Sequence, residues 1–541
     1  MTTTTTTASL APATYGNWRK PSSPGLPRLG MLGTTAALSS LVLVMFVQIL
    51  AGLIAAGVCI VLVLSALAPL VWQNRAGRNG WQVLVAKTAW RAGRRRRQHL
   101  YSSSLTGPIS FGSARLPGLL ASSRMLSAIT AHGEQFALIH LPSTKHFAVV
   151  IRCDPEGSQL VDVETVDEWV GSWGTWLARL GHEASLEACS VTVETAPDPG
   201  SRLAAEVDAM LTDDAPALSR AMLTEAAASY PHGSAAVTAY LTLTFSARRV
   251  SHTEAEGVLG VGGGKKSTGG SGAKRAASVR TPEEMAAQIG RRLPLLLHQL
   301  RSVGAGTGRA MTAAEVAETV RVAYDPAAAT LLDQARAQQA RQQAHLNPNE
   351  VAPSLVEWAD AGPVAQVESW DHLRHDSGAS ITWQMVDVPH GAVQSRILEQ
   401  LLDADEHLAR KRVTLIYRPH DPASAARVAD ADVRTAVGRA SLRKGEVKAG
   451  ETLALAKARQ SASEQASGAG LTRFSMLVTA TVDDPAKLAH AAEVIDQLGP
   501  ACQLRLRRCF FSQAAAFTAA LGVGVVLPKH VAVPEVVRDY L

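Results

Sequence analysis

The first quarter of the chain contains no acidic residue. No Asp or Glu occurs in residues 1–133 of the 541-residue sequence, whereas this stretch holds 13 Lys and Arg residues. Because the whole chain has a net charge of +6, residues 134–541 carry −7 by difference. A basic N-terminal region followed by an acidic remainder favours contact with an anionic membrane surface. It disfavours nucleic-acid binding, for which basic charge is usually spread over the folded domain.

Cysteine is scarce as well, and its spacing argues against two kinds of site. The sequence has no CxxC pair and no regular cysteine spacing, so neither a disulfide framework nor a zinc site is indicated. We expect the cysteines to be small buried apolar residues in a reducing compartment. They are Cys59, Cys153, Cys189, Cys502 and Cys509.

The phosphate-binding motifs of nucleotide enzymes are also missing. Residues 260–267 read Gly-Val-Gly-Gly-Gly-Lys-Lys-Ser, but no register fits the P-loop pattern GxxxxGK[ST]. Either Lys265 occupies the place of the second glycine, or Lys266 occupies the place of the magnesium-binding Ser or Thr. Residues 304–308 follow a predicted helix instead of a strand and lack the GxGxxG spacing of dinucleotide sites.

Other sequence motifs of catalytic and metal-binding sites are missing too. His372 and His375 with Asp371 and Asp376 are metal-binding residue types, but their spacing lacks the glutamate of HExxH. No GxSxG motif occurs, and no cysteine has an activating neighbourhood. The sequence therefore predicts no enzyme, no catalytic residue, no cofactor and no metal.

A long charge-free segment is what the N-terminal region does contain. Residues 29–74 carry no charged side chain, and one helix of that length would measure about 69 Å, twice the roughly 30 Å hydrocarbon core. We therefore predict a transmembrane hairpin with helices at about 32–49 and 53–72. Its tight turn near Gln48–Gly52 would lie at the far headgroups, because unpaired backbone is costly in hydrocarbon.

The flanks of this hairpin predict its orientation. Basic residues before and after it place both ends in the cytoplasm by the positive-inside rule, and tryptophans occur where interfacial aromatics are expected. The predicted membrane-interface anchors are Trp18, Arg19, Lys20, Arg28, Trp72, Arg75, Arg78, Trp81, Arg94, Arg95, Arg96 and Arg97. From Trp81 to Arg97 the apolar residues share one helical face, which predicts an amphipathic helix along the anionic inner surface.

The rest of the chain reads as an α+β cytoplasmic region. Residues 136–141 and 146–153 predict a β-hairpin, and apolar residues at helical spacing over 166–180 predict a core helix. We further expect strands at about 188–194 and 237–245 and helices at about 200–212, 215–229, 281–303 and 313–323. The last third shows two strand–helix–strand runs, over 381–418 (helix 393–402) and 474–508, around a helical arm at 422–467. Such β-α-β units suggest a ferredoxin-like sandwich with mixed or antiparallel sheets.

These features divide the chain into seven segments. They are a disordered cytoplasmic tail (1–30), the transmembrane hairpin (31–73), the basic amphipathic juxtamembrane helix (74–103), a first α+β domain (104–250), a Gly/Lys/Ser-rich loop (251–280), a helical connector (281–345), and a second α+β domain (346–541) with a helical insertion at about 420–467.

Two stretches of the sequence resemble components of type IV secretion systems. Residues 15–21 (Tyr-Gly-Asn-Trp-Arg-Lys-Pro) and the uncharged hairpin resemble the start of PrgI-like membrane subunits. The body resembles the non-motor N-terminal region of VirB-type secretion ATPases at residues 136–141, 472–474 and 511–521. In those ATPases a similar Gln…Phe…Leu segment precedes the P-loop motor, which we do not expect here.

This combination looks like a conjugation-associated membrane protein of actinobacteria. The resemblance implies a scaffold subunit that binds anionic inner-leaflet lipids, a separate VirB-type ATPase and other membrane subunits in an oligomeric assembly. It implies no direct nucleic-acid contact. Two alternatives stay open: an EccE-type subunit of a type VII secretion system, which also has two N-terminal helices, and a nucleotide-binding membrane enzyme that uses the loop at 257–277.

Overall fold

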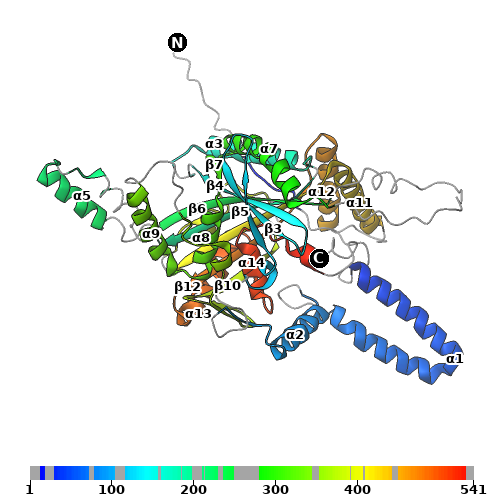
Figure 1. Cartoon of the computed structure of the whole chain (residues 1–541). Helices are drawn as coiled ribbons and strands as arrows, with labels where there is room; N and C mark the ends of the chain where they lie inside the picture. The colour runs from blue at the N-terminus through cyan, green and yellow to red at the C-terminus, as the bar shows by residue number, and fades with distance from the viewer. Residues whose placement is uncertain are drawn as a thin grey trace, which may run out of the picture.

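The protein is an α+β structure built on one large sheet whose strands pair antiparallel (Figure 1). The computed structural model describes residues 13–18, 30–71, 78–103, 116–155, 157, 160–183, 185–197, 207, 210–212, 214–229, 235–248, 279–343, 353–389, 391–405, 408–441 and 449–531. Most of the expected N-terminal tail and of the Gly/Lys/Ser-rich loop therefore lies outside the described residues, as does most of the expected helix at 200–212.

The first half of the body contains the elements that the sequence predicts there. The expected hairpin is β3 and β4, the expected core helix is α3, and the later strands and helices are β5, α5, β6, α7 and α8. The bounds are β2 (Arg124–Ile129), β3 (Gln135–Leu141), β4 (His146–Asp154), α3 (Val163–Leu180), β5 (Leu186–Pro197), α5 (Ala217–Ser229), β6 (Ala235–Ser246), α7 (Pro282–Leu300), β7 (Thr307–Ala310), α8 (Ala313–Tyr324) and α9 (Ala328–Gln343).

The second half follows the prediction with one correction. The helix expected over 393–402 begins only at Glu399, because Val393 forms a backbone bridge with Tyr15 (N···O 2.8 Å in both directions). The bounds are β8 (Ala365–Glu368), β9 (Leu373–His375), β10 (Gly378–Asp387), α10 (Glu399–Leu402), β11 (Arg410–Pro419), α11 (Pro422–Ser441), α12 (Ala449–Ala466), β12 (Thr472–Val482), α13 (Leu488–Ala501), β13 (Arg505–Arg508), α14 (Gln513–Ala520) and α15 (Leu527–His530).

Strand pairing reveals a repeated topology within the sheet. In the second half the order is β13–β10–β12–β11, and in the first half it is β7–β4–β6–β5. Each half thus has the interleaved pairing of a β-α-β-β-α-β unit, preceded by a hairpin (β2–β3 or β8–β9) and followed by a helix (α8 or α14). We call residues 124–324 the first repeat and residues 365–520 the second repeat.

The two repeats join edge to edge through β5 and β11. Thr192 and Thr414 lie opposite each other, and each precedes by five residues the proline that ends its strand. Their hydroxyl oxygens are 3.2 Å apart. A residue that pairs with its own equivalent marks an approximate two-fold axis, so one continuous sheet runs from β2 to β1 (Leu100–Ser102), which pairs with β8.

Three apolar clusters hold the sheet between helices. In the first repeat α3 and α7 pack on one face, with Trp176 and Ile289 buried. In the second repeat α13 packs around Trp383. The third cluster contains α8 and α14 and includes side chains of both repeats, among them Tyr324 and Phe517. The two repeats therefore share a core and cannot be treated as separate packing units.

The N-terminal region stands apart from this body. Helix α1 (Gly30–Val71) extends away from the sheet, and α2 (Gly80–Arg95) follows it back to the body (Figure 1). Within α1 the backbone of Gly52 has φ 82° and ψ −179°, outside the helical region, and the helix bends there. The apolar helix is thus present where the sequence predicts it.

Candidate membrane-anchoring site

Helix α1 exposes a continuous apolar surface. Among the described residues it is the helix long and apolar enough to cross a membrane, over Gly33–Leu70. Ile49, Leu53 and Ile54 are 79%, 80% and 88% exposed. Leaving such side chains in water costs about 1.5–3 kcal/mol each relative to burial. A stretch of this length needs an apolar surrounding that the body does not provide.

Gly52 allows the bend in this helix. Its positive φ of 82° lies where a Cβ atom is strained, and no other atom lies within 4 Å of the position of a Cβ. The bend divides α1 into stretches of 22 and 19 residues, 30–51 and 53–71. Each measures about 30 Å at 1.5 Å per residue, which matches the hydrocarbon core.

Helix α2 folds back against the end of α1. The indole N–H of Trp81 donates to the carbonyl oxygen of Ala66 at 2.7 Å. At Gly80 a Cβ would come within 2.9 Å of the carbonyl oxygen of Pro69, so glycine permits this close approach. The apolar face that contains Trp81, Leu84 and Val85 is exposed. This face has the apolar spacing expected of an interfacial helix.

The opposite side of α2 packs on the body. Trp90 lies against Phe511, with ring centroids 6.0 Å apart, and the Arg94 guanidinium lies 5.5 Å from the Trp90 ring. Trp370 stacks on Phe510 at 5.4 Å, and the Phe511 N–H donates to the Trp370 carbonyl oxygen at 2.7 Å. These contacts fix the orientation of α2 relative to the sheet.

The predicted anchor residues occupy three places. Arg94, Arg95, Arg96 and Arg97 are exposed at the end of α2, and Trp81 is exposed at its start. Trp18 is half-buried in the segment 13–18, which lies on the body: the Tyr15 hydroxyl donates to Asp167 Oδ1 at 3.1 Å. Arg78 lies just before α2. The remaining anchors, Arg19, Lys20, Arg28, Trp72 and Arg75, fall outside the described residues.

The sequence does not predict which residues of the α+β body contact α2 and the residues just before it. The neighbouring residues Phe510 and Phe511, which follow β13, contact Arg78 and Trp90, although hundreds of residues separate them in sequence. The alternating Arg505-Leu506-Arg507 run signals a strand with basic residues on one face. Nothing in the sequence alone places that face beside α2.

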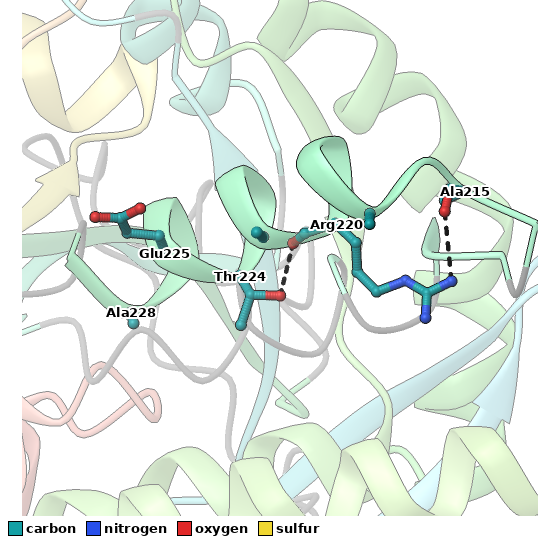
Figure 2. A pocket seen from close by; sticks show the side chains of 7 residues that line it. Ala215, Arg220, Thr224, Glu225 and Ala228 are labelled. Carbon is teal, nitrogen blue, oxygen red and sulfur yellow. Dashed lines mark hydrogen bonds between the residues drawn. The ribbon is translucent and has the colours of Figure 1, made fainter.

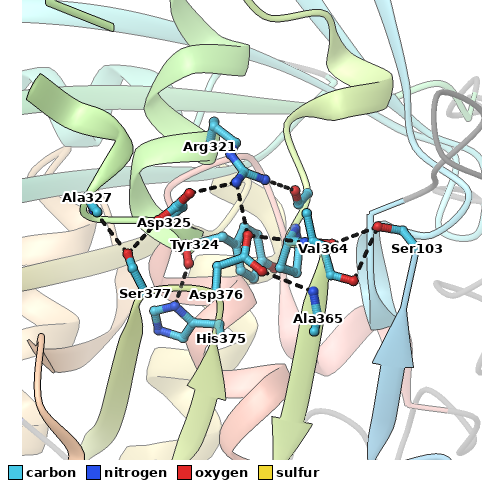
Figure 3. Close-up of polar contacts among 12 residues, drawn as sticks. Ser103, Arg321, Tyr324, Asp325, Ala327, Val364, Ala365, His375, Asp376 and Ser377 are labelled. Carbon is cyan, nitrogen blue, oxygen red and sulfur yellow. Dashed lines mark hydrogen bonds and ion pairs between the residues drawn. The ribbon is translucent and has the colours of Figure 1, made fainter. Parts of the chain in front are cut away.

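A polar cluster connects the two repeats near the start of β10 (Figure 3). The Arg321 guanidinium of α8 pairs with Asp325 at 2.7 Å and with Asp376 at 3.0 Å, and it donates to the Gly362 carbonyl oxygen at 2.7 Å. Asp376 also accepts the backbone N–H groups of Val364 and Ala365. Each charged group in the cluster has partners, so the cluster holds α8 on the second repeat.

His375 has a structural environment. Its Nδ1 lies 2.6 Å from the Tyr324 carbonyl oxygen, so Nδ1 carries the proton, and Nε2 accepts from the Ser380 hydroxyl at 2.7 Å. Burial lowers the pKa of His375 to about 4. His372 instead lies 2.9 Å from Asp371. Within the described chain, His, Cys, Asp and Glu side chains do not form a group of three suited to a metal.

The hollows found on the described surface do not gather reactive groups. One lies along a single helix, α5, where Arg220 donates to the Ala215 carbonyl oxygen and Thr224 donates to the Arg220 carbonyl oxygen (Figure 2). Glu225 points away from both. Another, of about 380 Å³, lies between α9 and residues 355–364 and has mainly apolar walls besides Arg321 and its partners.

Comparison with known proteins identifies part of the N-terminal region. A family model described as a domain of unknown function (DUF8461) matches residues 22–82, which include α1 and the first residues of α2. No curated protein matches the chain. The charge-free segment and the start of the helix that follows it are therefore similar to a domain that occurs in other proteins.

Proposed function

We propose that the chain is a non-enzymatic scaffold subunit of an inner-membrane secretion complex of the type IV or conjugation kind. In this proposal α1 anchors the chain, and the α+β body docks a separate cytoplasmic ATPase and sister subunits. The observation that carries the proposal is an exposed apolar helix joined, through an amphipathic helix packed on the body, to a large folded sheet.

In this proposal α1 crosses the membrane twice. Its two stretches each match the hydrocarbon thickness, and Gly52 supplies the turn between them. The basic residues after α1, including Arg94–Arg97, favour the cytoplasmic side by the positive-inside rule. The body follows them into the cytoplasm, and Gly52 lies at the outer surface.

Cysteine labelling tests this topology. In a full-length chain with Cys59→Ser, we expect Gln48→Cys to react with a membrane-impermeant maleimide in intact cells. Ser463→Cys in α12 is the matched control and should react only after the cells are permeabilised. Protection of Gln48→Cys in intact cells, with labelling of Ser463→Cys, would reverse the orientation and contradict a cytoplasmic body.

The helical arm α11–α12 is the docking element in this proposal. Its two helices pack on each other, and the chain enters and leaves it at adjacent residues: the His420 N–H donates to the Leu471 carbonyl oxygen at 2.9 Å. Much of the arm is exposed, including Val437 and Leu453 at 42% and 55%. A projecting hairpin of this kind offers surface that the sheet does not need for its own stability.

Affinity purification in mild detergent from the native host tests the assembly. We expect a VirB-type ATPase and further membrane subunits to accompany the full-length chain, as identified by mass spectrometry. An FtsK-like ATPase with small WXG proteins would assign the chain to a type VII machine. Recovery of the chain alone, with ATP turnover lost on Lys265→Ala, would replace the scaffold by a nucleotide enzyme.

A further inference from the structure

One end of the sheet exposes apolar side chains. Leu100 of β1 lies directly opposite Val367 of β8, so the two side chains share one face of the sheet. Successive side chains of a strand point to opposite faces, and Glu368 accepts the Ala514 N–H of α14. Leu100 and Val367 therefore point away from α14, and they are 49% and 39% exposed. Apolar residues that stay exposed at the edge of a sheet indicate an interaction surface.

The hairpin that joins β8 to β9 adds a tryptophan at its tip. The Ser369 N–H donates to the His372 carbonyl oxygen at 2.8 Å, which closes a tight turn around Trp370. The Trp370 ring stacks on Phe510, with ring centroids 5.4 Å apart. The side chain is nevertheless 50% exposed. The indole is therefore held in one orientation by the body while half of its surface stays accessible.

Basic residues adjoin these apolar side chains. Arg374 of β9 pairs with Val367, so it lies on the same face of the sheet, and it is exposed. The exposed arginine run 94–97 at the end of α2 leads directly into β1, because the Leu100 N–H donates to the Arg97 carbonyl oxygen at 3.1 Å. Apolar groups flanked by arginines favour an anionic surface as partner.

The acidic residues of the β8–β9 hairpin do not cancel this charge. Asp371 Oδ1 lies 2.9 Å from His372 Nδ1, and the Glu368 carboxylate faces α14. Five arginines, at positions 94–97 and 374, stand against these two carboxylates. This end of the sheet is therefore positive.

Side-chain contacts connect the hairpin tip to the candidate membrane anchor. Phe510, on which Trp370 stacks, accepts a hydrogen bond at a long 3.5 Å from Arg78, which lies two residues before α2. The next residue, Phe511, packs against Trp90 of α2. The tip and α2 therefore lie on adjoining parts of the molecule. A bilayer that receives the apolar face of α2 would lie next to the tip as well.

We propose that this end of the sheet contacts the anionic inner leaflet, as a second membrane contact made by the body itself. We call the surface formed by Leu100, Val367, Trp370 and Arg374 the membrane-contact edge. The inference rests on the proposed membrane function and extends it from α1 and α2 to the sheet. Tryptophan favours the headgroup region, and arginine is attracted to lipid phosphates. Together with α2, the membrane-contact edge would fix the tilt of the sheet on the bilayer.

Fluorescence quenching in nanodiscs tests this contact. The full-length chain with Cys59→Ser carries a fluorophore on Ser369→Cys, next to Trp370, and the remaining native cysteines are buried. The discs contain phosphatidylcholine and phosphatidylglycerol, with or without a spin-labelled quencher lipid. The matched control is His132→Cys at the tip of the β2–β3 hairpin, at the opposite end of the sheet. We expect quenching at Ser369→Cys to exceed that at His132→Cys at least about threefold, because only the former lies at the bilayer surface.

Exposed apolar side chains supply much of this contact. Leu100→Ser with Val367→Ser should therefore lower the quenching at Ser369→Cys by about half or more. Leu218→Ser with Val237→Ser removes exposed apolar side chains elsewhere on the body and should leave the quenching unchanged. All four side chains are partly exposed, so neither double variant should prevent folding.

A further label, at Val85→Cys on the exposed face of α2, separates this contact from the membrane function. Quenching at Val85→Cys without quenching at Ser369→Cys would keep the anchor and overturn the membrane-contact edge. Equal quenching at Ser369→Cys and His132→Cys would overturn it too. An unquenched Ser369→Cys that is shielded from maleimide in permeabilised cells would assign the surface to a protein partner instead. Failure of the chain to enter discs at all would overturn the membrane function itself.

Discussion

Glu194 lies where the two repeats meet and faces two arginines of β11. Its carboxylate accepts from Arg412 Nε at 2.7 Å and pairs with Arg410, and all three side chains are largely shielded from water. Burial opposes ionisation of Glu194, but the charges of Arg412 and Arg410 outweigh it and lower its pKa to about 2. The carboxylate is therefore ionised in the folded protein at any physiological pH.

Removal of this single charge should weaken the joint between the repeats. Glu194→Gln leaves two guanidinium groups without their buried partner, and breaking such a network costs about 3–5 kcal/mol of unfolding free energy. We expect a clear drop in the melting temperature of the full-length chain in detergent, measured by intrinsic fluorescence. Glu225→Gln on exposed α5 is the control. An equal melting temperature for wild type and Glu194→Gln would contradict a structural role for the triad.

The pH dependence of stability follows from the same group. Because the folded pKa of Glu194 is about 2 and its ordinary value is 4.5, the ionised carboxylate stabilises the fold above pH 4.5. That contribution is lost as pH falls from 4.5 toward 2. Wild type should therefore lose melting temperature over this range more steeply than Glu194→Gln, in parallel thermal scans at stepped pH.

His375 should contribute in a different pH window. Its folded pKa of about 4 lies below its ordinary value of 6.5, so the unfolded chain takes up the proton first as pH falls. Stability therefore declines between pH 6.5 and 4 and levels off below. His375→Gln should have a lower melting temperature at neutral pH but a flatter profile over this window. A parallel decline in His375→Gln would assign the pH dependence to other groups.

At the residue scale, the sequence predicts side chains through local spacing alone. The helical stripe over 166–180 correctly places Val166, Leu177 and Leu180 in the core. Phe511 and Glu194 could not be predicted as partners of Trp90 and Arg412, because their contacts depend on strand order and not on neighbours in sequence. The interfacial role of Arg94–Arg97 stays a prediction, although all four side chains are exposed as it requires.

At the element scale, strong periodicity gives reliable predictions and weak periodicity does not. The alternating strand β12 and the amphipathic helices α3 and α7 lie where their patterns indicate. The expected helix at 393–402 failed in its first half because a long-range bridge to Tyr15 satisfies the backbone of Val393 in extended form. Short strands such as β9, of three residues, carry too little pattern to be seen.

The arm α11–α12 should be separable from the fold and required for assembly. Replacing residues 422–468 by a short Gly-Ser turn keeps the pairing of Pro419 with Thr472, so β11 and β12 should stay joined. We expect the variant to reach the membrane and to melt within a few degrees of wild type, but to lose the co-purifying ATPase.

The first repeat provides a matched control for this deletion. Its insertion lies in the equivalent loop, between Pro197 and Ala235. These two residues pair with each other, just as Pro419 and Thr472 do in the second repeat. Removal of residues 198–234 should leave ATPase recovery unchanged. If the arm deletion retains the ATPase while the control loses it, docking belongs to the first insertion, and our assignment of the arm is wrong.

At the scale of the whole molecule, the sequence predicts the class of fold but not its symmetry. The two β-α-β runs of the last third are visible as patterns, and their strands do lie in one antiparallel sheet. The pattern of the equivalent unit in the first half is harder to see, because its second helix begins only after a gap of 35 residues, 247–281, that follows β6. Pairing of Thr192 with Thr414 makes the equivalence evident only in three dimensions.

The shared core predicts that the repeats unfold together. After α14 the chain crosses from the second repeat to the first: the Thr414 hydroxyl donates to the Ala520 carbonyl oxygen at 2.8 Å, and the Thr242 hydroxyl donates to the Gly522 carbonyl oxygen at 2.5 Å. Two residues on, Gly524 has a φ of 83°, and a Cβ there would meet the Ala148 side chain at 2.2 Å. A substitution at Gly524 should therefore disturb β4 of the first repeat.

Gly524→Ala and Gly438→Ala test this coupling as a pair. At Gly524 the added methyl group clashes and strains the backbone, so we expect amide hydrogen exchange to accelerate in β4 and β6 as well as in β10 and β12. Gly438 lies inside α11 with no atom near its Cβ position, so alanine should stabilise that helix by about 1 kcal/mol and leave the sheet unchanged. Faster exchange confined to one repeat in Gly524→Ala would mean that the halves open independently. Faster exchange in both would mean that the segment after α14 joins the two repeats into a single cooperative body.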